Sequence, residues 1–236
     1  EDEATAGSGE RAAPAAAGEE PRGAAPGDGL VPLESILRTD ELTRRPPRRP
    51  DYEAERRLLA SLVQSLAKPA VDILRIIAEK ILEGLTADSA GVSLLRKDEK
   101  RFHWAAIAGA WQAHVGGGTP STFGPSADVL RSNEPQLFQH FERRYAYLRP
   151  VMPAVEEGLL VPFYVEGKAV GTLWALSHSE RRFDAEDLRL LESLGRFASA
   201  AHQVVEYREL EHSRRAAALN LMEDAVQSRR ALEKIN

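Results

Sequence analysis

Two long apolar runs separated by a short turn dominate the hydrophobic pattern, between Leu159 and His178. Both runs are rich in β-branched and aromatic residues, and the turn Val165–Lys168 has Gly167 where a tight hairpin requires positive φ. The pattern therefore predicts two antiparallel strands. The second run, Val170–Ala175, is almost continuously apolar, which predicts a strand that is covered on both faces and central in its sheet.

Helical periodicity precedes this region. From Asp51 to Leu66 apolar residues recur at helical spacing, with Asp51 as a candidate N-cap. Pro69 interrupts the pattern, which resumes over 70–85 with one wide apolar face. We expect the first helix to lead into the domain and to pair with a partner chain, whereas the second should pack flat on a sheet.

A second hairpin is predicted over 90–95 and 102–108, around a charged tip. The chain between Gly109 and Leu159 is irregular and holds a large share of the aromatic residues. Loops with bulky apolar side chains and glycine hinges, laid over a sheet, are typical of a small-molecule pocket. The segments predicted here are a helical turn at 111–115, a flexible break at 116–120, a short helix at 126–131, a brief strand at 136–138 and loops at 142–153.

A very long helix is predicted from Asp184, its N-cap, because no proline follows before the end of the chain. It would exceed 50 residues, or about 75 Å. Followed backward, its heptad pattern reaches Glu211 and Arg214, so we expect a register shift or a weakened segment near His212. The heptad core positions are Ala218, Ala225 and Leu232 at one site and Leu221, Ser228 and Ile235 at the other.

The first 50 residues are rich in Ala, Gly, Pro, Glu and Arg and have few large hydrophobic residues. Such a segment cannot bury enough apolar surface to offset its ordering entropy, so we expect it to be disordered. The basic run Arg44–Arg49 is interpreted as a solvated linker. The expected division is a disordered tail at 1–50, an entry helix at 51–69, a folded domain at 70–205 and a C-terminal helix or coiled coil at 206–236.

Composition narrows the chemistry further. The net charge of −5 provides no basic field for nucleic acid or an anionic membrane. The chain has no cysteine, which excludes disulfides, thiolate metal sites, cysteine nucleophiles and thioether-linked cofactors. There is no apolar window long enough to span a membrane and no signal peptide, so a cytoplasmic protein without a membrane partner is expected. Because the sequence begins with Glu1 and ends within a helical pattern, we expect it to be part of a longer protein.

Four short segments occur in a characteristic order along the chain. They are Ala87–Leu95, Phe123–Pro125, Leu160–Phe163 with Gly167–Trp174, and Phe183–Leu188. In this order they resemble the GAF domain of bacterial sensory proteins, over about Val71 to Val205. The resemblance implies an α+β fold: an antiparallel β-sheet with helices on one face, a ligand or chromophore pocket under loops on the other, and flanking helices that form a coiled coil. Proteins that it resembles usually stand N-terminal to a histidine kinase, some with PAS domains.

The sequence departs from that family in one informative way. Many relatives have cysteine after the Gly-Pro of the Phe-Gly-Pro loop, whereas this chain has Ser126. Covalent bilin attachment is therefore excluded, as is the thiol chemistry of the free-methionine sulfoxide reductase branch. The Asn-Lys-x-x-x-Asp signature of the cyclic-nucleotide branch is also missing, so binding of a cyclic nucleotide has no support.

No motif for catalysis is found. The six histidines occur singly, without metal-ligand spacing, and no nucleophile, metal set or phosphate loop is present. We therefore expect this segment not to be an enzyme. Aromatic residues more often fill a core than line a site, and both alternatives stay open. The candidates for the ligand pocket are Trp104, Trp111, Phe123, Ser126, Phe138, His140, Tyr147 and Trp174.

The function that we expect is a regulatory sensor module that responds to a small ligand or another signal. It would signal through a dimeric coiled coil to a C-terminal output domain in the same chain, a histidine kinase or a PAS domain. The alternative is a structural GAF scaffold that has lost its ligand and only dimerises. The expected homodimer would use Leu59, Leu62, Leu66, Leu194, Ala201, Val205, Leu221 and Leu232.

Overall fold

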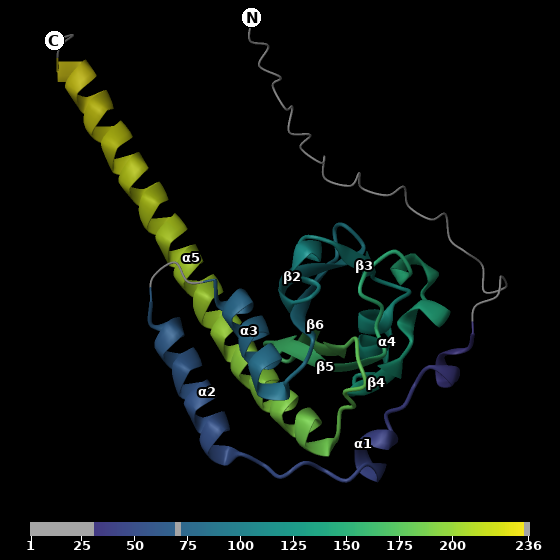
Figure 1. Cartoon of the computed structure of the whole chain (residues 1–236). Coiled ribbons are helices and arrows are strands. Elements are labelled where there is room, and N and C mark those ends of the chain that lie inside the picture. Colours follow the sequence, from purple (N-terminus) through teal and green to yellow (C-terminus); the bar gives the residue numbers. More distant parts are fainter. Residues whose placement is uncertain (1–30, 69–71, 234–236) are drawn as a thin grey trace, which may run out of the picture. The chain divides into compact units, whose positions relative to one another are not determined.

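The computed structural model describes residues 31–68 and 72–233, and in this part a single six-stranded antiparallel sheet has the order β3-β2-β1-β6-β5-β4. Helices α3 and α5 cover one face of the sheet, and α4 lies with the loops on the other face (Figure 1). This is the α+β architecture that the sequence predicts. The strands are β1 (Ser89–Arg96), β2 (Arg101–Gly109), β3 (Gly118–Pro120), β4 (Gln136–Gln139), β5 (Glu157–Val165) and β6 (Lys168–Ser177).

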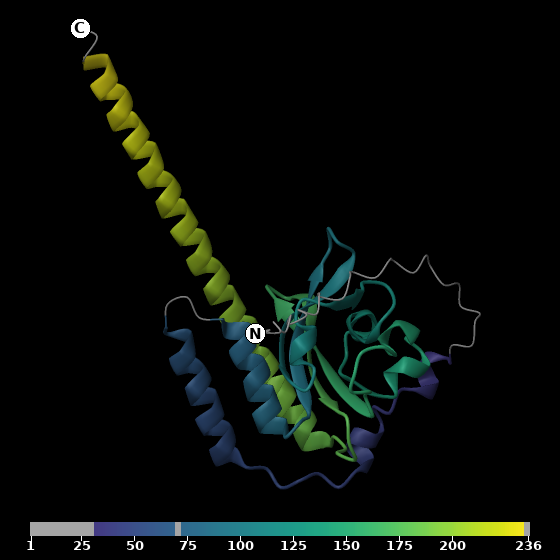
Figure 2. The ribbon, with the colours of Figure 1, turned by 45° about the horizontal axis from the view of Figure 1, so that its top comes forward.

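Five α-helices and four short 3-10 helices accompany the sheet in the described ranges. Figure 2 shows α2, α3 and the first half of α5 together on one side of the sheet. The helices are α1 (Glu41–Arg44), α2 (Tyr52–Leu66), α3 (Ile73–Leu85), α4 (Pro125–Ser132) and α5 (Ala185–Glu233), with 3-10 turns η1 (Leu33–Ser35), η2 (Gln112–His114), η3 (Phe141–Arg143) and η4 (Ala146–Leu148).

The central hairpin is confirmed. β5 and β6 pair from Glu157–Ser177 to Val165–Lys168, and the turn residues Glu166 and Gly167 have φ of 49° and 75°. Positive φ at both turn positions matches the right-handed twist of the strands. β6 lies between β1 and β5 and is buried from Gly171 to its end, as its continuous apolar run predicts.

The main core lies between the sheet and the helices. Ile77 and Ile81 of α3, Leu191 and Leu194 of α5, and Phe163 of β5 are fully buried there. Burying each such side chain stabilises the fold by about 1.5–3 kcal/mol. α2 contributes Leu58 and Leu62 to the same core, so its apolar face packs within its own chain. Leu58 and Leu62 are therefore not accessible to a partner chain in this structure, and pairing of the remaining surface of α2 stays a prediction.

One local expectation also needs correction. Residues 118–120, predicted as part of a flexible break, form strand β3, which pairs with β2. Gly118 permits this pairing, because a Cβ there would lie 2.0 Å from the carbonyl oxygen of Phe102. α5 continues through His212 as one helix, in which Arg214 and Glu211 pair at 3.5 Å. The register shift or weakened segment expected near His212 stays a prediction. The two charges interrupt the heptad seam and leave the helix intact.

The segment Val31–Pro50 was predicted to be disordered, and this prediction is wrong, whereas residues 1–30 lie outside the described residues. Ile36 and Leu42 are buried, at 0% and 1% exposure. The backbone N–H of Arg38 donates to Leu137 (2.7 Å), and that of Gln139 donates to Ile36 (2.8 Å). These bonds cover the edge strand β4, which would otherwise present unpaired backbone groups. We call residues 31–50 the N-terminal strap.

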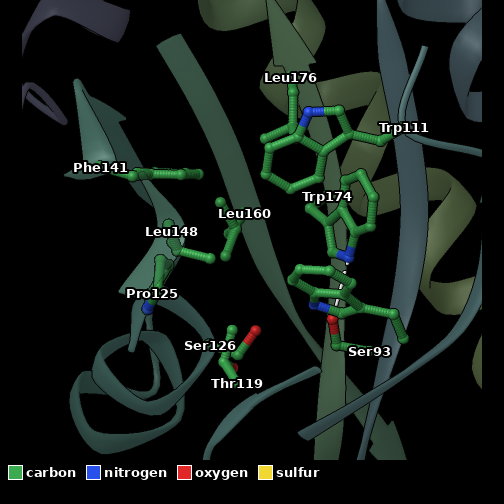
Figure 3. A pocket seen from close by; sticks show the side chains of 11 residues that line it. Ser93, Trp111, Thr119, Pro125, Ser126, Phe141, Leu148, Leu160, Trp174 and Leu176 are labelled. Atoms are coloured by element: carbon green, nitrogen blue, oxygen red, sulfur yellow. Dashed lines mark hydrogen bonds between the residues drawn. The ribbon is translucent and has the colours of Figure 1, made fainter. Parts of the chain in front are cut away.

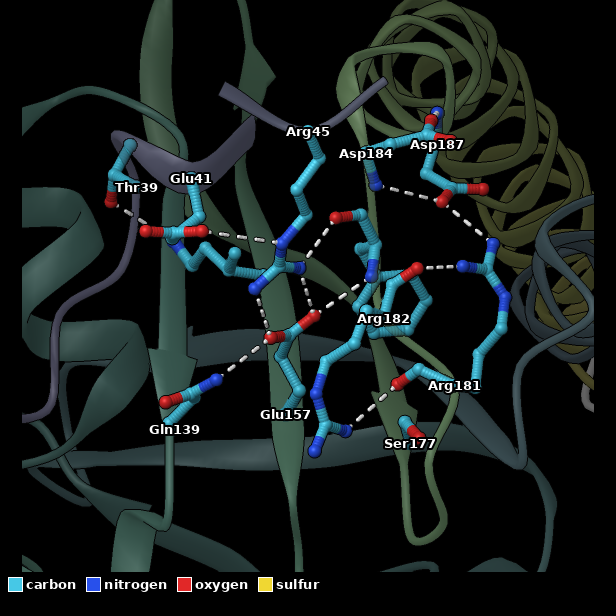
Figure 4. Close-up of polar contacts among 12 residues, drawn as sticks. Thr39, Glu41, Arg45, Gln139, Glu157, Ser177, Arg181, Arg182, Asp184 and Asp187 are labelled. Atoms are coloured by element: carbon cyan, nitrogen blue, oxygen red, sulfur yellow. Dashed lines mark hydrogen bonds and ion pairs between the residues drawn. The ribbon is translucent and has the colours of Figure 1, made fainter. Parts of the chain in front are cut away.

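A buried ion pair fixes the strap to the domain (Figure 4). Arg45 donates from Nη1 and Nη2 to the two carboxylate oxygens of Glu157, at 2.8 and 2.9 Å, and Glu157 is fully buried. The same carboxylate accepts the backbone N–H of Phe183 (2.7 Å) and the Nε2 of Gln139 (3.2 Å). Glu157 raises the pKa of the Arg45 guanidinium by hydrogen bonding. One carboxylate thus joins the strap, β5, β4 and the segment before α5.

The start of α5 is held by a second polar cluster. Asp184 caps the helix, accepting the N–H groups of Glu186 (2.8 Å) and Asp187 (3.1 Å). Asp187 is fully buried and contacts Arg181 (2.6 Å) and Arg48 (2.8 Å). Burial raises the pKa of the Asp187 carboxyl against the opposing effect of these two arginines. The sequence predicted a solvated linker over Arg44–Arg49, but Arg45 and Arg48 form ion pairs with the buried carboxylates of Glu157 and Asp187.

We predict that Arg45→Met destabilises the chain by about 3–5 kcal/mol, because it leaves the Glu157 carboxylate buried without its cation. Arg44→Met is the matched control, since the Arg44 side chain is 67% exposed and pairs at the surface with Asp40. Chemical denaturation measures both free energies of unfolding. Equal losses for the two variants would contradict a structural role for the Arg45–Glu157 pair.

Candidate functional site

The face of the sheet opposite α3 and α5 carries a small cavity. Because side chains alternate along a strand, Ser93 of β1, Trp174 and Leu176 of β6 and Leu160 of β5 all point to this face. Figure 3 shows them forming one side of the cavity. The other lining residues come from β2, β3, the loops and the short helices. They are Trp104, Trp111, Thr119, Pro125, Ser126, Phe141 and Leu148.

Three tryptophans form the apolar wall. The ring centroid of Trp111 lies 5.6 Å from that of Trp104 and 6.1 Å from that of Trp174. Two of the three indole N–H groups donate a hydrogen bond within the described part of the chain. Trp174 Nε1 donates to Ser93 Oγ (2.9 Å), and Trp111 Nε1 donates to the carbonyl of Pro153 (2.8 Å). These bonds orient both rings, as buried indoles require.

Gly91 makes room for Trp174. A Cβ at this position would lie 2.2 Å from Cζ2 of Trp174 and 2.6 Å from the carbonyl oxygen of Ala106. Both distances are below any normal contact, so only glycine fits beneath the ring. The Gly-x-Ser spacing of Gly91 and Ser93 therefore sets where Trp174 lies.

A short hydrogen-bond chain fixes the loop that carries Trp111. His178 contacts the carbonyl of Ala154 through Nδ1 (2.8 Å) and Ser89 Oγ through Nε2 (2.8 Å). Since a carbonyl only accepts, Nδ1 carries a proton and donates to Ala154. The Ser89 hydroxyl in turn accepts the backbone N–H of Trp111 (3.0 Å). His178 also stacks on the Trp111 ring, with centroids 5.7 Å apart.

The polar groups of the cavity are hydroxyls. Ser126 Oγ lies 2.9 Å from Thr172 Oγ1. Thr119 is 3% exposed, and its hydroxyl has no hydrogen-bond partner within the described ranges. None of the eleven lining residues carries a charge. The cavity volume is about 30 Å³, enough for about two water molecules.

Buried phenols support the loop side of the cavity. Tyr145 donates to the carboxylate of Asp128, which is 3% exposed and pairs also with Arg131. Tyr147 donates to the carbonyl of Phe123 (2.8 Å). Burial raises the pKa of the Tyr145 and Tyr147 hydroxyls, and Asp128 raises both further. Both phenols are therefore neutral hydrogen-bond donors at ordinary pH.

The structure brings together half of the eight pocket candidates. Trp104, Trp111, Ser126 and Trp174 line the cavity. Phe123 and Tyr147 stand behind this lining and pack against Tyr145. Phe138 and His140 are not part of the site: Phe138 packs on Phe141, and the half-exposed His140 faces Glu142 and Glu156 at 3.9 Å. His140 follows strand β4 directly, where a left-handed backbone (φ 51°) turns the chain away.

Sequence reasoning missed the other lining residues. Ser93, a polar residue inside an apolar strand, and Leu160 and Leu176, which alternate with core residues, were detectable from strand periodicity. The loop residues had no such signal. The missed residues are Ser93, Thr119, Pro125, Phe141, Leu148, Leu160 and Leu176.

The proposed dimer residues fall into three groups. Leu62, Leu194 and Ala201 are fully buried in the core of their own chain and are not accessible to a partner in this structure. Leu59, Leu66 and Val205 are partly buried against that core. Leu221 is 71% exposed, and the side chain of Leu232 lies outside the described part.

The described residues contain neither a cluster of metal-ligating side chains nor a membrane-spanning helix. Within residues 31–68 and 72–233 no group of three His, Asp or Glu side chains is arranged to hold a metal ion. No helix in these ranges has the length and hydropathy needed to cross a membrane.

Comparisons with known proteins agree on the fold. A family model described as "GAF domain" matches residues 67–203, more than half of the chain. Free methionine-R-sulfoxide reductase from Neisseria meningitidis, solved in complex with its substrate, is similar with a TM-score of 0.55 and 17% identity, over 68% of this chain and 95% of that one. No curated protein matches the sequence.

Two further solved domains are similar at low identity. The GAF domain of a phosphoenolpyruvate-protein phosphotransferase from Coxiella burnetii gives a TM-score of 0.54 at 17% identity, covering 67% of this chain and 99% of its own. The phycoerythrobilin-bound GAF domain of a cyanobacterial phytochrome gives a TM-score of 0.51 at 13% identity. The match covers 69% of this chain and 100% of that domain. At such identities the similarity concerns the fold.

We predict that Gly91→Ala destabilises the chain by about 1–3 kcal/mol, because the new methyl group displaces Trp174, and that it changes the near-UV circular dichroism of the tryptophans. Gly195→Ala in α5 is the matched control: its Cβ would meet only Val161, at 3.8 Å. That change should stabilise the chain by about 0.5–1 kcal/mol. An unchanged near-UV spectrum in Gly91→Ala would refute the close contact.

Proposed function

The chain belongs to the GAF domain family of regulatory sensory modules, and from that premise we propose that it senses a small molecule in the tryptophan-lined cavity and transmits the change through β5 and β6 to α5. α5 would pass it to an output domain further along the protein. A histidine kinase is the output that we propose, because the resemblance of the sequence is to sensors that precede such kinases.

The observation that carries this proposal is the alternation of side chains along β5. Leu160 faces the cavity, whereas its neighbours Leu159 and Val161 belong to the core cluster that contains Leu191 and Leu194 of α5. The cavity and the output helix thus share one layer of backbone. A shift of β5 that accommodates a ligand on one face must move the residues that support α5 on the other, because packed cores transmit displacement.

The lining also defines the class of ligand. Without a charged group in the cavity, burial of an ionised ligand would cost several kcal/mol that nothing repays. Three indole rings favour a planar, apolar ligand. The unpartnered hydroxyl of Thr119 offers such a ligand one hydrogen bond. We therefore propose a small, uncharged, planar molecule.

Binding requires the cavity to enlarge. Its present volume of about 30 Å³ is below the about 300–1,000 Å³ of typical ligand pockets. Trp111 is the side chain placed to move, since it precedes a glycine-rich segment in which Gly116 has φ of 89° and open space around it. Displacement of the Trp111 ring would also break its Nε1 hydrogen bond to the carbonyl of Pro153 and its stacking on His178. The ligand would thus select an open conformation of this loop.

The small cavity equally favours a second candidate function, a GAF scaffold without a ligand. In that case the three tryptophans are a filled core and the domain contributes only assembly. The two functions differ in one measurable respect, because only the sensor gains stability from a small molecule.

We predict that at least one small, uncharged, planar compound raises the melting temperature of the chain. At a free ligand concentration one hundred times Kd, binding should raise the free energy of unfolding by about 2.7 kcal/mol. Hydrogen exchange in the bound state should slow in β5, β6 and the first half of α5. If no compound of a broad panel raises the melting temperature, and native mass spectrometry of protein from its host detects no retained ligand, the scaffold function is supported.

We further predict that Thr119→Val separates stability from binding. The Thr119 hydroxyl is buried and has no hydrogen-bond partner among the described residues, so its removal should leave the free chain at least as stable. The same change should weaken the ligand-induced rise in melting temperature. Thr172→Val is the control, because it removes the partner of Ser126 (2.9 Å) and should destabilise the free chain. Full ligand response in Thr119→Val would exclude this hydroxyl from recognition.

A further inference from the structure

The N-terminal strap, residues 31–50, is anchored on both faces of the sheet. Ile36 belongs to the apolar cluster around the cavity, whereas Leu42 belongs to the cluster beneath α5. Because packed side chains transmit displacement, a segment that is buried in both clusters can connect them. What the strap connects is set by the contacts at its two ends.

The first end of the strap contacts a loop that lines the cavity. This loop, residues 141–148, has Phe141 and Leu148 at its ends, and both line the cavity. Between them, Arg144 donates from Nη1 to the carbonyl of Val31 (3.0 Å), and its guanidinium lies 5.3 Å from the ring centroid of Phe123. Displacement of the cavity loop, as we call residues 141–148, therefore acts directly on the first residue of the strap.

Hydrogen bonds join the same part of the strap to β4, which leads into the cavity loop. The backbone N–H of Leu137 donates to Thr39 Oγ1 (3.1 Å), in addition to the bonds that Arg38 and Gln139 donate across this edge. Residues 31–39, β4 and the cavity loop are thus bonded together. A shift of the loop carries this part of the strap with it.

The other end of the strap holds the first turn of α5 (Figure 4). Arg45 Nη1 donates to the carbonyl of Phe183 (2.7 Å). The backbone N–H of Arg48 donates to Asp184 Oδ2 (2.9 Å), whereas Oδ1 of the same carboxylate caps the helix. The Arg48 guanidinium lies 2.8 Å from the buried carboxylate of Asp187. The strap therefore fixes the carboxylate on which the start of α5 depends.

We propose that the strap is a second connection between the cavity and α5, and that it makes the order of the first turn of α5 depend on the position of the cavity loop. Only residues 40–44, which are the short helix α1 and its N-cap, separate the two bonded parts of the strap. A shift of the loop would thus loosen the hold of Arg45 and Arg48 on the cap, and the N–H groups of the first turn would lose their acceptor.

The strap reaches a different part of α5 from the part that β5 supports. β5 packs in the core cluster with Leu191 and Leu194, in the second and third turns of α5, whereas the strap bonds to Asp184 and Asp187. This inference rests on the proposed function, because it adds a route by which a change at the cavity reaches α5.

The first experiment measures hydrogen exchange at the backbone N–H groups of Glu186 and Asp187, which Asp184 caps, in the full chain by NMR. Arg144→Met removes the bond to Val31 and should raise both exchange rates about tenfold, as coupling between two sites typically does. Rates in β6 serve as the reference for global unfolding.

Arg131→Met is the matched control for this change. Arg131 lies on the same side of the sheet as Arg144, but its hydrogen bonds go to Asp128 and to the carbonyl of Thr122. Relative to β6, this variant should leave exchange at Glu186 unchanged. Unchanged exchange in Arg144→Met, or an equal increase in both variants, would overturn the inference.

The second experiment starts from the other end of the strap. Arg48 and Arg181 both contact Asp187, at 2.8 and 2.6 Å, but only Arg48 belongs to the strap. Since equilibrium coupling is reciprocal, Arg48→Met should raise exchange at the N–H groups of Tyr145 and Leu148 in the cavity loop by a similar factor. Arg181→Met should not. Equal effects of the two variants on the loop would contradict coupling through the strap.

The third experiment separates the strap from the sheet as the route. Four residues, Gly-Ser-Gly-Ser, are inserted between Thr39 and Asp40, which lengthens the strap at a small entropic cost and keeps its anchoring side chains. Slow exchange at the N–H of Leu137, the donor to Thr39, verifies that the strap is still bound. In this background Arg144→Met should no longer change exchange at Glu186. A persistent increase would assign the coupling to β4 and β5 and overturn the inference.

These results are independent of any ligand. Coupling through the strap in a chain that no compound stabilises would retain this inference and remove the proposed sensing. A compound that raises the melting temperature of a chain without such coupling would retain sensing and leave β5 as the connection to α5.

Discussion

The buried carboxylate of Glu157 is the interaction on which the arrangement of the domain depends. A charge inside a protein is tolerated only when all its hydrogen-bonding capacity is used. Glu157 meets this condition with Arg45, Gln139 and the backbone N–H of Phe183. Each partner belongs to a different segment, so the strap, the edge of the sheet and the start of α5 must all be in place together. Loss of any one leaves the charge unsatisfied and weakens the other two.

The sheet places the cavity and α5 on opposite faces. Its two faces bury different clusters, one of tryptophans and hydroxyls and the other of aliphatic residues from α3 and α5. The strap contacts both, since Ile36 belongs to the first cluster and Leu42 to the second. The region around the cavity and the start of α5 are therefore connected by the sheet and also by a separate segment that crosses its edge. Contiguous packed elements of this kind can carry energetic coupling between two sites.

Sequence periodicity predicted the elements whose partners are close along the chain. The central hairpin, the Asp184 cap and the tryptophans of β2 and β6 all followed from local patterns. The strap did not, because its composition is typical of disorder and its ordering depends on Glu157, 112 residues beyond Arg45. Thr119 was missed for a similar reason: β3 is three residues long and pairs only because Gly118 allows a close backbone approach. Long-range charge pairs and short edge strands have no periodic signal.

The way in which α5 is held limits how it can respond to a change in the cavity. Its first turn is fixed by the Asp184 cap and by Asp187, which Arg48 and Arg181 contact. Rotation of the helix about its axis would break these bonds and expose a buried carboxylate, which is costly. The middle of the helix rests on aliphatic contacts with β5, which have no preferred direction. A displacement of β5 is therefore accommodated more easily by a tilt of α5 about its first turn. Such a tilt would displace the part of α5 beyond Val205, where the contacts with the core end.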